Sequence, residues 1–301
     1  MDYSGSAITQ KIREHYNEPF EAAEEARLLA VDFLKSFNDK HIKLIDCPPH
    51  KRIFLFFLTR VIKTYSAIFC LCRQGYGQDT SPLLRSFLET LISAKYILHD
   101  PKSADKNAAR FVEYKWVIFK RHLSESECDP ASKKSDDFVE NREQIIAKFE
   151  EFKKKYKIES DRALITWSGK SVKDMAKKID RKLLEEYDSA FRLYSRFSHP
   201  SIIGDREYLN FENDILKLSS LPSFIGIVPN LKRAVNYLCD FLFVFDDLFL
   251  LGRKQKINDL VSKSTLIFNS EKFRNELPFE KSSLNLTKEN LDKIRVQFEM
   301  E

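Results

Sequence analysis

Residues 19–45, PFEAAEEARLLAVDFLKSFNDKHIKLI, show the pattern that decides the fold. Apolar residues recur there at intervals of three and four, at Ala23, Ala26, Leu29, Ala30, Phe33, Leu34 and Phe37. This spacing gathers them on one face of an α-helix, which can pack against a second helix. The prolines of the following DCPPH, residues 46–50, stop the helix.

The same periodicity returns along the rest of the chain. It predicts further helices over residues of about 51–73, 81–98, 103–123, 138–158, 171–179, 181–199, 230–251 and 287–299. A short hairpin between residues 200 and 230 stays open, although no alternating run there is convincing. We therefore predict an all-α protein built as a multi-helix bundle. Its expected parts are an N-terminal helical extension (residues 1–49), a bundle core (50–252) and a C-terminal helical tail (253–301).

Composition narrows the class of protein. The 50 Lys and Arg exceed the 45 Asp and Glu by only five, too small an excess to diagnose a nucleic-acid binder. None of the five cysteines is in a C-x-x-C pair, which argues against zinc and for reduced thiols in the cytosol. The polar N-terminus carries no apolar core of the signal-peptide kind. We expect a cytoplasmic protein.

Two apolar stretches are long enough to resemble membrane spans. Residues 53–72 contain Arg60 and Lys63, and residues 235–252 contain three aspartates. Each central charge would cost about 2.5–3.5 kcal/mol in a bilayer, which favours buried helices of a bundle. Stable membrane insertion is therefore not expected.

The stretch FRLYSRFSHPS, residues 191–201, suggests a site. On a continuous α-helix, Asp188, Arg192, Ser195 and His199 form one polar stripe beside the apolar face. One interpretation is a solvated surface on which Asp188 pairs with Arg192. The other is a catalytic site in which His199 moves a proton and Arg192 stabilises negative charge.

A second polar pair lies in SPLLRSFLETLISAKYI, residues 81–97. Arg85 and Glu89 are four residues apart among apolar neighbours, so we expect the pair to be partly buried. It could be a structural clamp between helices or the inner wall of a polar pocket. Both interpretations remain open from the sequence.

Other motifs carry weaker signals. TWSGKS, residues 166–171, resembles the end of a phosphate loop, but the first glycine and the preceding strand are missing. We expect Trp167 to pack the turn and Ser168 or Ser171 to cap the next helix. The histidines lack metal-ligand spacing, and Asp246 and Asp247 point from adjacent helical faces. No metal or cofactor is predicted.

Three segments together resemble a known kind of protein. Arg85, Ser86 and Glu89, then Trp167, then Ser195 and His199 look like the motifs of an uncharacterised all-helical family of bacterial proteins. That arrangement is similar to the HEPN superfamily of helical bundles, and it implies a HEPN-like core. Many HEPN members are metal-independent ribonucleases of toxin and antiphage systems that act as dimers, with an Arg-x4–6-His motif.

The resemblance implies a role for each motif residue. Arg192 and His199, with six residues between them, fit the upper limit of that motif, although Leu193 stands where active members usually have a polar residue. His199 would act on the ribose 2′-hydroxyl and Arg192 on the charge of the phosphorane. The implied function is RNA cleavage in bacterial defence or stress, by a homodimer, at Arg192, His199 and Ser195, with Arg85, Glu89 and Asp188 in support. The alternative is a non-catalytic interaction or dimerisation module.

Overall fold

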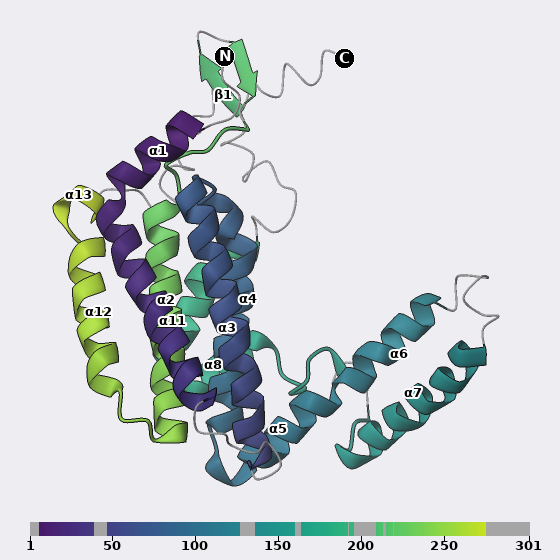
Figure 1. Ribbon diagram of the computed structural model, residues 1–301. Helices are drawn as coiled ribbons and strands as arrows, with labels where there is room; N and C mark the ends of the chain where they lie inside the picture. The colour runs from purple at the N-terminus through teal and green to yellow at the C-terminus, as the bar shows by residue number, and fades with distance from the viewer. Residues whose placement is uncertain are drawn as a thin grey trace. The chain divides into compact units, whose positions relative to one another are not determined.

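The computed structural model describes residues 6–38, 47–126, 136–159, 164–191, 193–195, 209–212, 215–218 and 220–274 (Figure 1). These residues belong to two compact units. The first takes its described residues from Met1–His41, Leu58–Leu91 and Glu186–Glu301, and the second from Ile42–Phe57 and Ile92–Glu185. The predicted division into extension, core and tail stays a prediction.

Helices dominate both units, so the predicted all-α class is confirmed. The first unit holds α1 (Ser6–His15), α2 (Asn17–Asn38), α11 (Ile227–Phe249), α12 (Lys254–Phe268), α13 (Glu271–Arg274), the later part of α3 (Pro49–Gln74) and the earlier part of α4 (Ser81–Leu98). Helices α2, α3, α4, α11 and α12 run alongside one another as a bundle (Figure 1). The helix predicted near residues 287–299 lies outside the described residues.

Ring contacts fix the directions of the helices in this bundle. Phe33 of α2 contacts Phe245 of α11 with ring centres 6.2 Å apart, and four residues later Phe37 contacts Phe249 at 5.4 Å. The two helices therefore run parallel. Helix α2 packs closely because its inner face carries small, fully buried alanines, namely Ala22, Ala23, Ala26 and Ala30. These residues include much of the apolar face predicted from the sequence.

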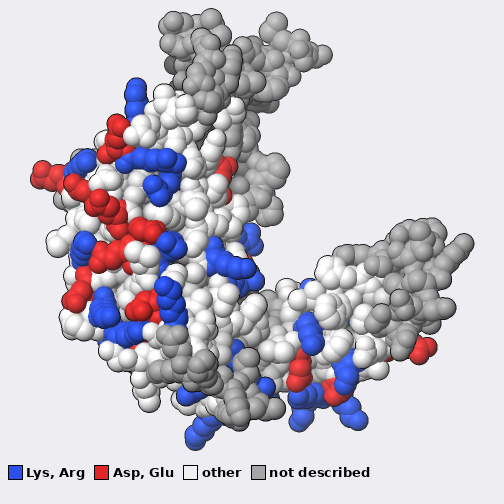
Figure 2. All heavy atoms as spheres, in the orientation of Figure 1, with Lys and Arg blue, Asp and Glu red and all other residues white. Residues whose placement is uncertain are grey.

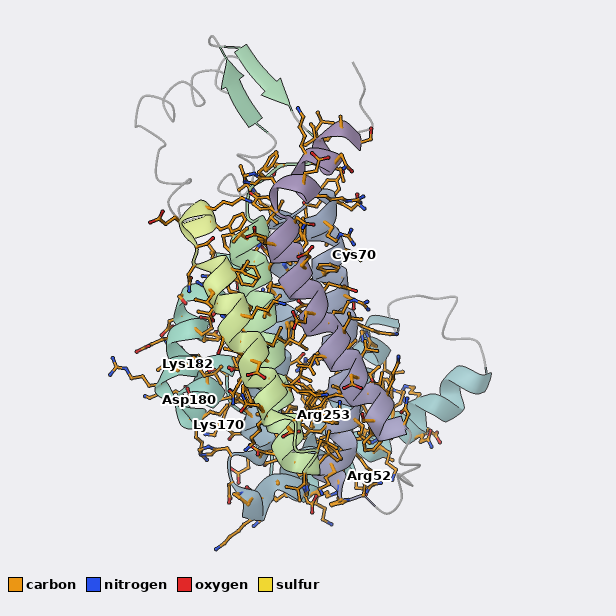
Figure 3. All side chains as sticks on the ribbon, turned by 60° about the vertical axis from the view of Figure 1, so that its left-hand side comes forward. Arg52, Cys70, Lys170, Asp180, Lys182 and Arg253 are labelled. Carbon is orange, nitrogen blue, oxygen red and sulfur yellow. The ribbon has the colours of Figure 1, made fainter. Side chains whose placement is uncertain are left out.

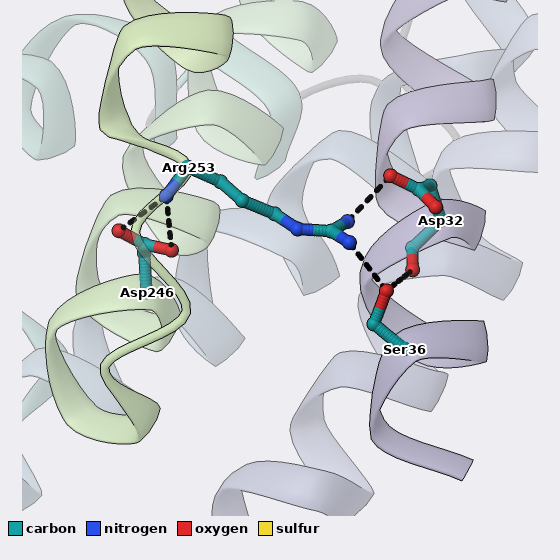
Figure 4. Close-up of polar contacts among 4 residues, drawn as sticks. All are labelled: Asp32, Ser36, Asp246 and Arg253. Carbon is teal, nitrogen blue, oxygen red and sulfur yellow. Dashed lines mark hydrogen bonds and ion pairs between the residues drawn. The ribbon is translucent and has the colours of Figure 1, made fainter. Parts of the chain in front are cut away.

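A polar clamp joins the corner between α11 and α12 to α2 (Figures 3 and 4). The buried carboxylate of Asp246 accepts hydrogen bonds from the backbone N–H of Arg253, with N–O distances of 3.0 and 3.2 Å. The Arg253 guanidinium then pairs with Asp32 at 2.5 Å and donates to the Ser36 hydroxyl. Asp246 therefore stabilises the turn between α11 and α12, at which the chain reverses so that α12 runs back along α2.

The second unit contains the other long helices and differs in one place from the prediction. It holds α5 (Ala104–Glu113), α6 (Lys115–Ser126), α7 (Asp136–Lys155), α8 (Val172–Ile179) and most of α9 (Arg181–Glu186), and α6 packs against α7. One helix was predicted over residues 103–123, but the structure has two helices there, because the helix is interrupted at Tyr114. The Tyr114 hydroxyl donates to the carbonyls of Leu164 and Ile165 at 2.6 and 3.0 Å, a tertiary anchor that the periodicity does not encode.

The predicted roles of the TWSGKS turn are confirmed. Trp167 is only 7% exposed and contacts the rings of Tyr96 and Phe111 at 5.8 and 5.3 Å. Ser171 caps α8 by accepting a hydrogen bond from the backbone N–H of Asp174 at 3.1 Å. The turn is therefore a packing element of the second unit.

A short antiparallel hairpin lies where the sequence left that question open. Strands β1 (Leu209–Glu212) and β2 (Ile215–Leu218) pair with Leu209 opposite Leu218 and Glu212 opposite Ile215. With only four residues in each strand, it is a small addition to a helical protein.

One described helix, α3, is long and apolar enough to cross a membrane by length and composition. In its most apolar window, 44% of the residues are buried within the protein, and a core helix of a bundle passes the same test. The second apolar stretch, residues 235–252, lies mostly in α11, and that helix does not pass this test. The described cysteines Cys47, Cys70, Cys72 and Cys239 are free thiols, and Cys128 lies outside the described residues.

Charges of both signs are mixed on the face drawn in Figure 2. In the first unit, Lys263 pairs with Glu25 at 2.5 Å, and Arg27 pairs with Glu24 at 2.6 Å. This interleaving along α2 and α12 agrees with the small net charge of the chain.

Candidate functional site

The structure places four of the six predicted site residues in the first unit. Arg85 and Glu89 lie on α4, Asp188 lies in the segment after α9, and Ser195 lies in a short helical stretch at the end of that segment. Arg192 and His199 lie outside the described residues. Their alignment with Asp188 and Ser195 therefore stays a prediction.

The helix that carries these residues is not a continuous α-helix. After α9 ends at Glu186, residues Tyr187–Phe191 form a π-helix, in which Tyr187 and Phe191 stack with ring centres 4.4 Å apart. Each residue of a π-helix turns the chain less than the 100° assumed for the stripe, because its hydrogen bonds span five residues. The assumption of a continuous α-helix, on which the predicted stripe depends, is therefore wrong over Tyr187–Phe191. Such π-helical turns are frequent at functional sites.

Ser195 makes a local hydrogen bond. Its hydroxyl donates to the carbonyl of Phe191, four residues earlier, at 2.7 Å, and its side chain is half-buried. This bond supports the chain on the C-terminal side of Arg192 in the sequence. Asp188 is also half-buried and has a polar partner.

Arg85 links α4 to the π-helix. Its guanidinium carbon lies 4.7 Å from the ring centre of Phe191, the residue directly before Arg192. Arg85 also pairs with Glu89 at 3.5 Å, with side-chain exposures of 31% and 40%. An ion pair this exposed contributes only about 0.5 kcal/mol to the free energy of unfolding. A cation–π contact contributes at least as much, so the contact with Phe191 is the more important one. The sequence predicted a partly buried pair, but gave no sign of the aromatic partner.

Ser86, the second residue of the Arg-Ser-x-x-Glu motif, connects α4 with α3. Its hydroxyl accepts a hydrogen bond from the Arg60 guanidinium at 3.1 Å. Arg60 is one of the two charges that argued against a membrane span, and here it binds a neighbouring helix. The motif therefore contacts two elements of the first unit.

A partly buried polar cluster, which begins at the residue directly before the π-helix, was not predicted from the sequence. The Glu186 carboxylate, at the end of α9, accepts a hydrogen bond from the Tyr237 hydroxyl of α11 at 2.5 Å. Arg233, one helical turn before Tyr237, lies 3.8 Å from the same carboxylate. Its guanidinium carbon also lies 5.7 Å from the ring centre of Tyr194. We call Glu186, Arg233, Tyr237 and Tyr194 the Glu186 cluster.

Electrostatics in the Glu186 cluster favour a charged arginine and protonated phenols. Burial raises the pKa of Tyr194 to about 12, and it raises the pKa of Tyr237 well above its ordinary value. Burial disfavours the charge on Arg233, but the oxygens of Tyr194, Glu186 and Tyr237 outweigh that effect and raise its pKa. The cluster is therefore a stable hydrogen-bonding anchor between α11 and the ends of the π-helix.

A weak sequence signal did point to this cluster. In LKRAVNYLCD, residues 231–240, Arg233 and Tyr237 stand four apart on a helix whose buried face is largely apolar. A charged residue on the inner face of a buried helix needs a polar partner. Glu186, however, lies 47 or more residues earlier, and nothing local identifies it as that partner.

A protein-family model described as "Family of unknown function (DUF5677)" matches residues 51–216, more than half of the 301 residues. The chain belongs to DUF5677. The part that matches DUF5677 contains all six predicted site residues, and the expectation of an uncharacterised family is confirmed. No curated protein and no solved structure matched the chain.

The described part of this DUF5677 protein holds no group of three or more His, Cys, Asp or Glu side chains placed to bind a metal ion. Asp246, half of the aspartate pair considered from the sequence, instead holds the backbone of Arg253. The groups near the π-helix of this DUF5677 chain include guanidinium and phenol groups, which can donate hydrogen bonds to anions, and also the carboxylates of Glu89, Asp188 and Glu186.

Proposed function

We propose that this protein is a metal-independent endoribonuclease related to the HEPN superfamily. His199 takes the proton of a ribose 2′-hydroxyl, whose oxygen then attacks the adjacent phosphorus. A bond forms between the 2′-oxygen and phosphorus, and the bond to the 5′-oxygen breaks. The leaving oxygen gains a proton, and the products carry a 2′,3′-cyclic phosphate and a 5′-hydroxyl. Arg192 stabilises the negative charge on the phosphorane.

One observation carries this proposal: the residues on both sides of Arg192 in the sequence are firmly anchored. Phe191, directly before it, is 8% exposed and lies under the Arg85 guanidinium. Leu193 and Tyr194, directly after it, are 8% and 1% exposed, and Tyr194 contacts Arg233. Rigid support of this kind is what a catalytic arginine needs, because catalysis depends on groups held in position before reaction.

The supporting residues have distinct proposed roles. Arg85 adds positive charge and orients the π-helix through Phe191, and Glu89 limits the freedom of Arg85. Asp188 orients a basic neighbour, and Ser195 supports the backbone through its bond to Phe191. In this account Ser195 is a positioning residue, because its hydroxyl proton is committed to a carbonyl.

The proposal extends to the biological setting that the resemblance implies. We infer a cytoplasmic homodimer that acts in bacterial defence or stress, because dimers are the active form of many HEPN ribonucleases. RNA is the substrate, and neither a metal ion nor a cofactor takes part. Light scattering coupled to gel filtration tests the dimer, and separation of cell membranes from cytosol tests the location.

The activity is tested with purified full-length protein and a mixed RNA pool in the presence of EDTA. We expect cleavage by the wild type and by Arg181→Ala, a control that removes an exposed arginine paired with Glu185. His199→Ala and Arg192→Ala should each abolish cleavage while leaving the thermal midpoint within about 2 °C of the wild type, because the proposal gives both side chains a catalytic and not a structural role. An intact RNA pool with the wild type would overturn the proposal.

A second function, a non-catalytic interaction module, is favoured by a different observation. In the second unit, Val112, Ile118 and Phe119 are 48%, 40% and 43% exposed. Apolar side chains of this kind suit a protein interface. Growth on expression separates the two functions: toxicity that is relieved by His199→Ala supports the ribonuclease, whereas toxicity that is relieved only by Phe119→Ser supports the module.

A further inference from the structure

Arg110 of α5, in the second unit, has unusual surroundings. Its guanidinium carbon lies 5.3 Å from the ring centre of Tyr156, which directly follows α7. Burial lowers the pKa of Arg110, and the oxygens of Tyr156 and Tyr96 oppose that effect. Tyr96 belongs to α4 and is 9% exposed. Arg110 is thus a half-buried cation between residues from three helical segments of the same unit.

The hydrogen-bonding capacity of this guanidinium is unused within the described part of the chain. Arginine carries five N–H donors, and no described side chain or carbonyl accepts from any of them. The Nε atom is buried without a hydrogen-bond partner. The Tyr156 hydroxyl oxygen beside it is also buried and makes no hydrogen bond of good geometry, although the Glu113 carboxylate lies close enough to help raise the pKa of Tyr156. Two such atoms in contacting side chains are uncommon, because buried polar groups are nearly always satisfied.

The neighbouring charges do not meet this need. Glu113 pairs with Lys155 at 2.6 Å and helps burial to raise the pKa of Tyr156, but it makes no ion pair with Arg110. The ammonium group of Lys178 lies 5.9 Å from the ring centre of Tyr96 and adds positive charge to this region. Asp100 interacts electrostatically with Lys178. The tyrosine rings offset part of the cost of burying the guanidinium, but they accept none of its directional N–H bonds.

We propose that Arg110, with the Tyr156 hydroxyl beside it, binds the phosphate group of a small molecule. The planar fork of a guanidinium donates two parallel hydrogen bonds to a phosphate, and a protonated phenol can donate a third. Burial raises the pKa of both Tyr96 and Tyr156, so these phenols keep their protons at neutral pH and can donate to an anion. The site is independent of the Arg192 and His199 chemistry.

Calorimetric titration of the full-length protein in a phosphate-free buffer of constant ionic strength tests this site. The probes are inorganic phosphate, adenosine monophosphate and adenosine. We expect saturable binding of one or both phosphate compounds and none of adenosine. Arg110→Lys should weaken binding at least about tenfold because it loses the bidentate fork, and Arg110→Met should abolish it. Arg181→Ala is the matched control and should bind like the wild type.

Three outcomes would overturn the site. The first is the absence of saturable phosphate binding by the wild type, and the second is equal affinity for adenosine and its monophosphate. The third is an affinity for phosphate that stays within twofold of the wild type in both Arg110 variants. If Arg110→Met does not fold, Tyr156→Phe, which removes only one donor, should still weaken binding severalfold, and unchanged binding would count against the site.

Discussion

The guanidinium of Arg85 lies 4.7 Å from the ring centre of Phe191, although the two residues are more than a hundred positions apart in the chain. This contact connects two motifs that the sequence analysis treated separately, the Arg-Ser-x-x-Glu helix and the Arg192…His199 segment. It joins α4 to the π-helix, on which the proposed site depends. Of the two interpretations of Arg85 and Glu89, a structural clamp and the wall of a polar pocket, this contact favours the clamp, which holds the π-helix through Phe191.

Removing this contact should affect activity more than stability. Arg85→Ala loses a cation–π contact and a loose ion pair, which together contribute about 1 kcal/mol to the free energy of unfolding. We expect a loss of about tenfold or more in RNA cleavage, because the support of Phe191 is weakened. Urea unfolding and single-turnover cleavage measure the two effects. Glu89→Gln, which keeps Arg85, is the matched variant and should retain most of the activity.

The Glu186 cluster should be important for stability. Tyr237→Phe removes one hydroxyl from a residue that is 4% exposed and deprives the Glu186 carboxylate of a donor. We expect a loss of about 1.5–2 kcal/mol in the free energy of unfolding, as for other hydrogen bonds to charged groups. Tyr76→Phe, at a tyrosine that is 37% exposed, is the control and should change little. Equal losses in both variants would contradict the role of the cluster.

Alkaline pH should destabilise the protein partly through Tyr194. Its pKa in the folded protein is about 12, whereas an unfolded tyrosine titrates near 10. Between these values the unfolded chain binds fewer protons than the folded one, so stability is complete below about pH 10 and falls as the pH rises toward 12. Tyr194→Phe should have a shallower decline in this window, by up to about 1.4 kcal/mol per pH unit. Urea unfolding on both sides of pH 10 measures it, and parallel declines would refute the assignment.

The Arg253 clamp offers a test of the bundle. In Arg253→Ala the backbone N–H that binds Asp246 remains, so only the contacts with Asp32, Ser36 and the ring of Phe33 are lost. We expect the free energy of unfolding to fall by about 2 kcal/mol. The neighbouring Lys254 forms an exposed pair with Asp247, and Lys254→Ala should be close to neutral. A smaller loss in Arg253→Ala than in Lys254→Ala would contradict this account.

Local pattern was sufficient to predict most of the described helices, although α1 and α12 were not among the predicted ranges. The periodicity of residues 20–37 gave α2, and an apolar run between proline and glycine signals gave α3 nearly to its ends. The break at Tyr114 could not be predicted in the same way. It accompanies hydrogen bonds to carbonyls some fifty residues later, and periodicity contains no information about such partners.

Contacts between residues distant in the sequence limited the prediction of the site even more than that of the fold. Arg85 and Glu89 were found because their spacing is local, but the contact of Arg85 with Phe191 depends on how distant helices pack. The π-helix of Tyr187–Phe191 was predicted as ordinary α-helix, since its sequence continues the apolar periodicity and contains no proline or glycine. The pairing of Glu186 with Arg233 was missed for a similar reason, because the two residues are 47 positions apart and nothing local identifies one as the partner of the other.

The most direct test of the central claim is the single-turnover cleavage of one short RNA and of the same oligomer with a 2′-deoxyribose at the cleaved position, in EDTA. The account predicts a 2′,3′-cyclic phosphate and a 5′-hydroxyl from the all-ribose strand, and no cleavage at the deoxyribose. It further predicts that the His199→Ala protein leaves both strands intact. Equal cleavage of the two strands, or a wild-type rate in the His199→Ala protein, would contradict the claim that His199 acts on a 2′-hydroxyl.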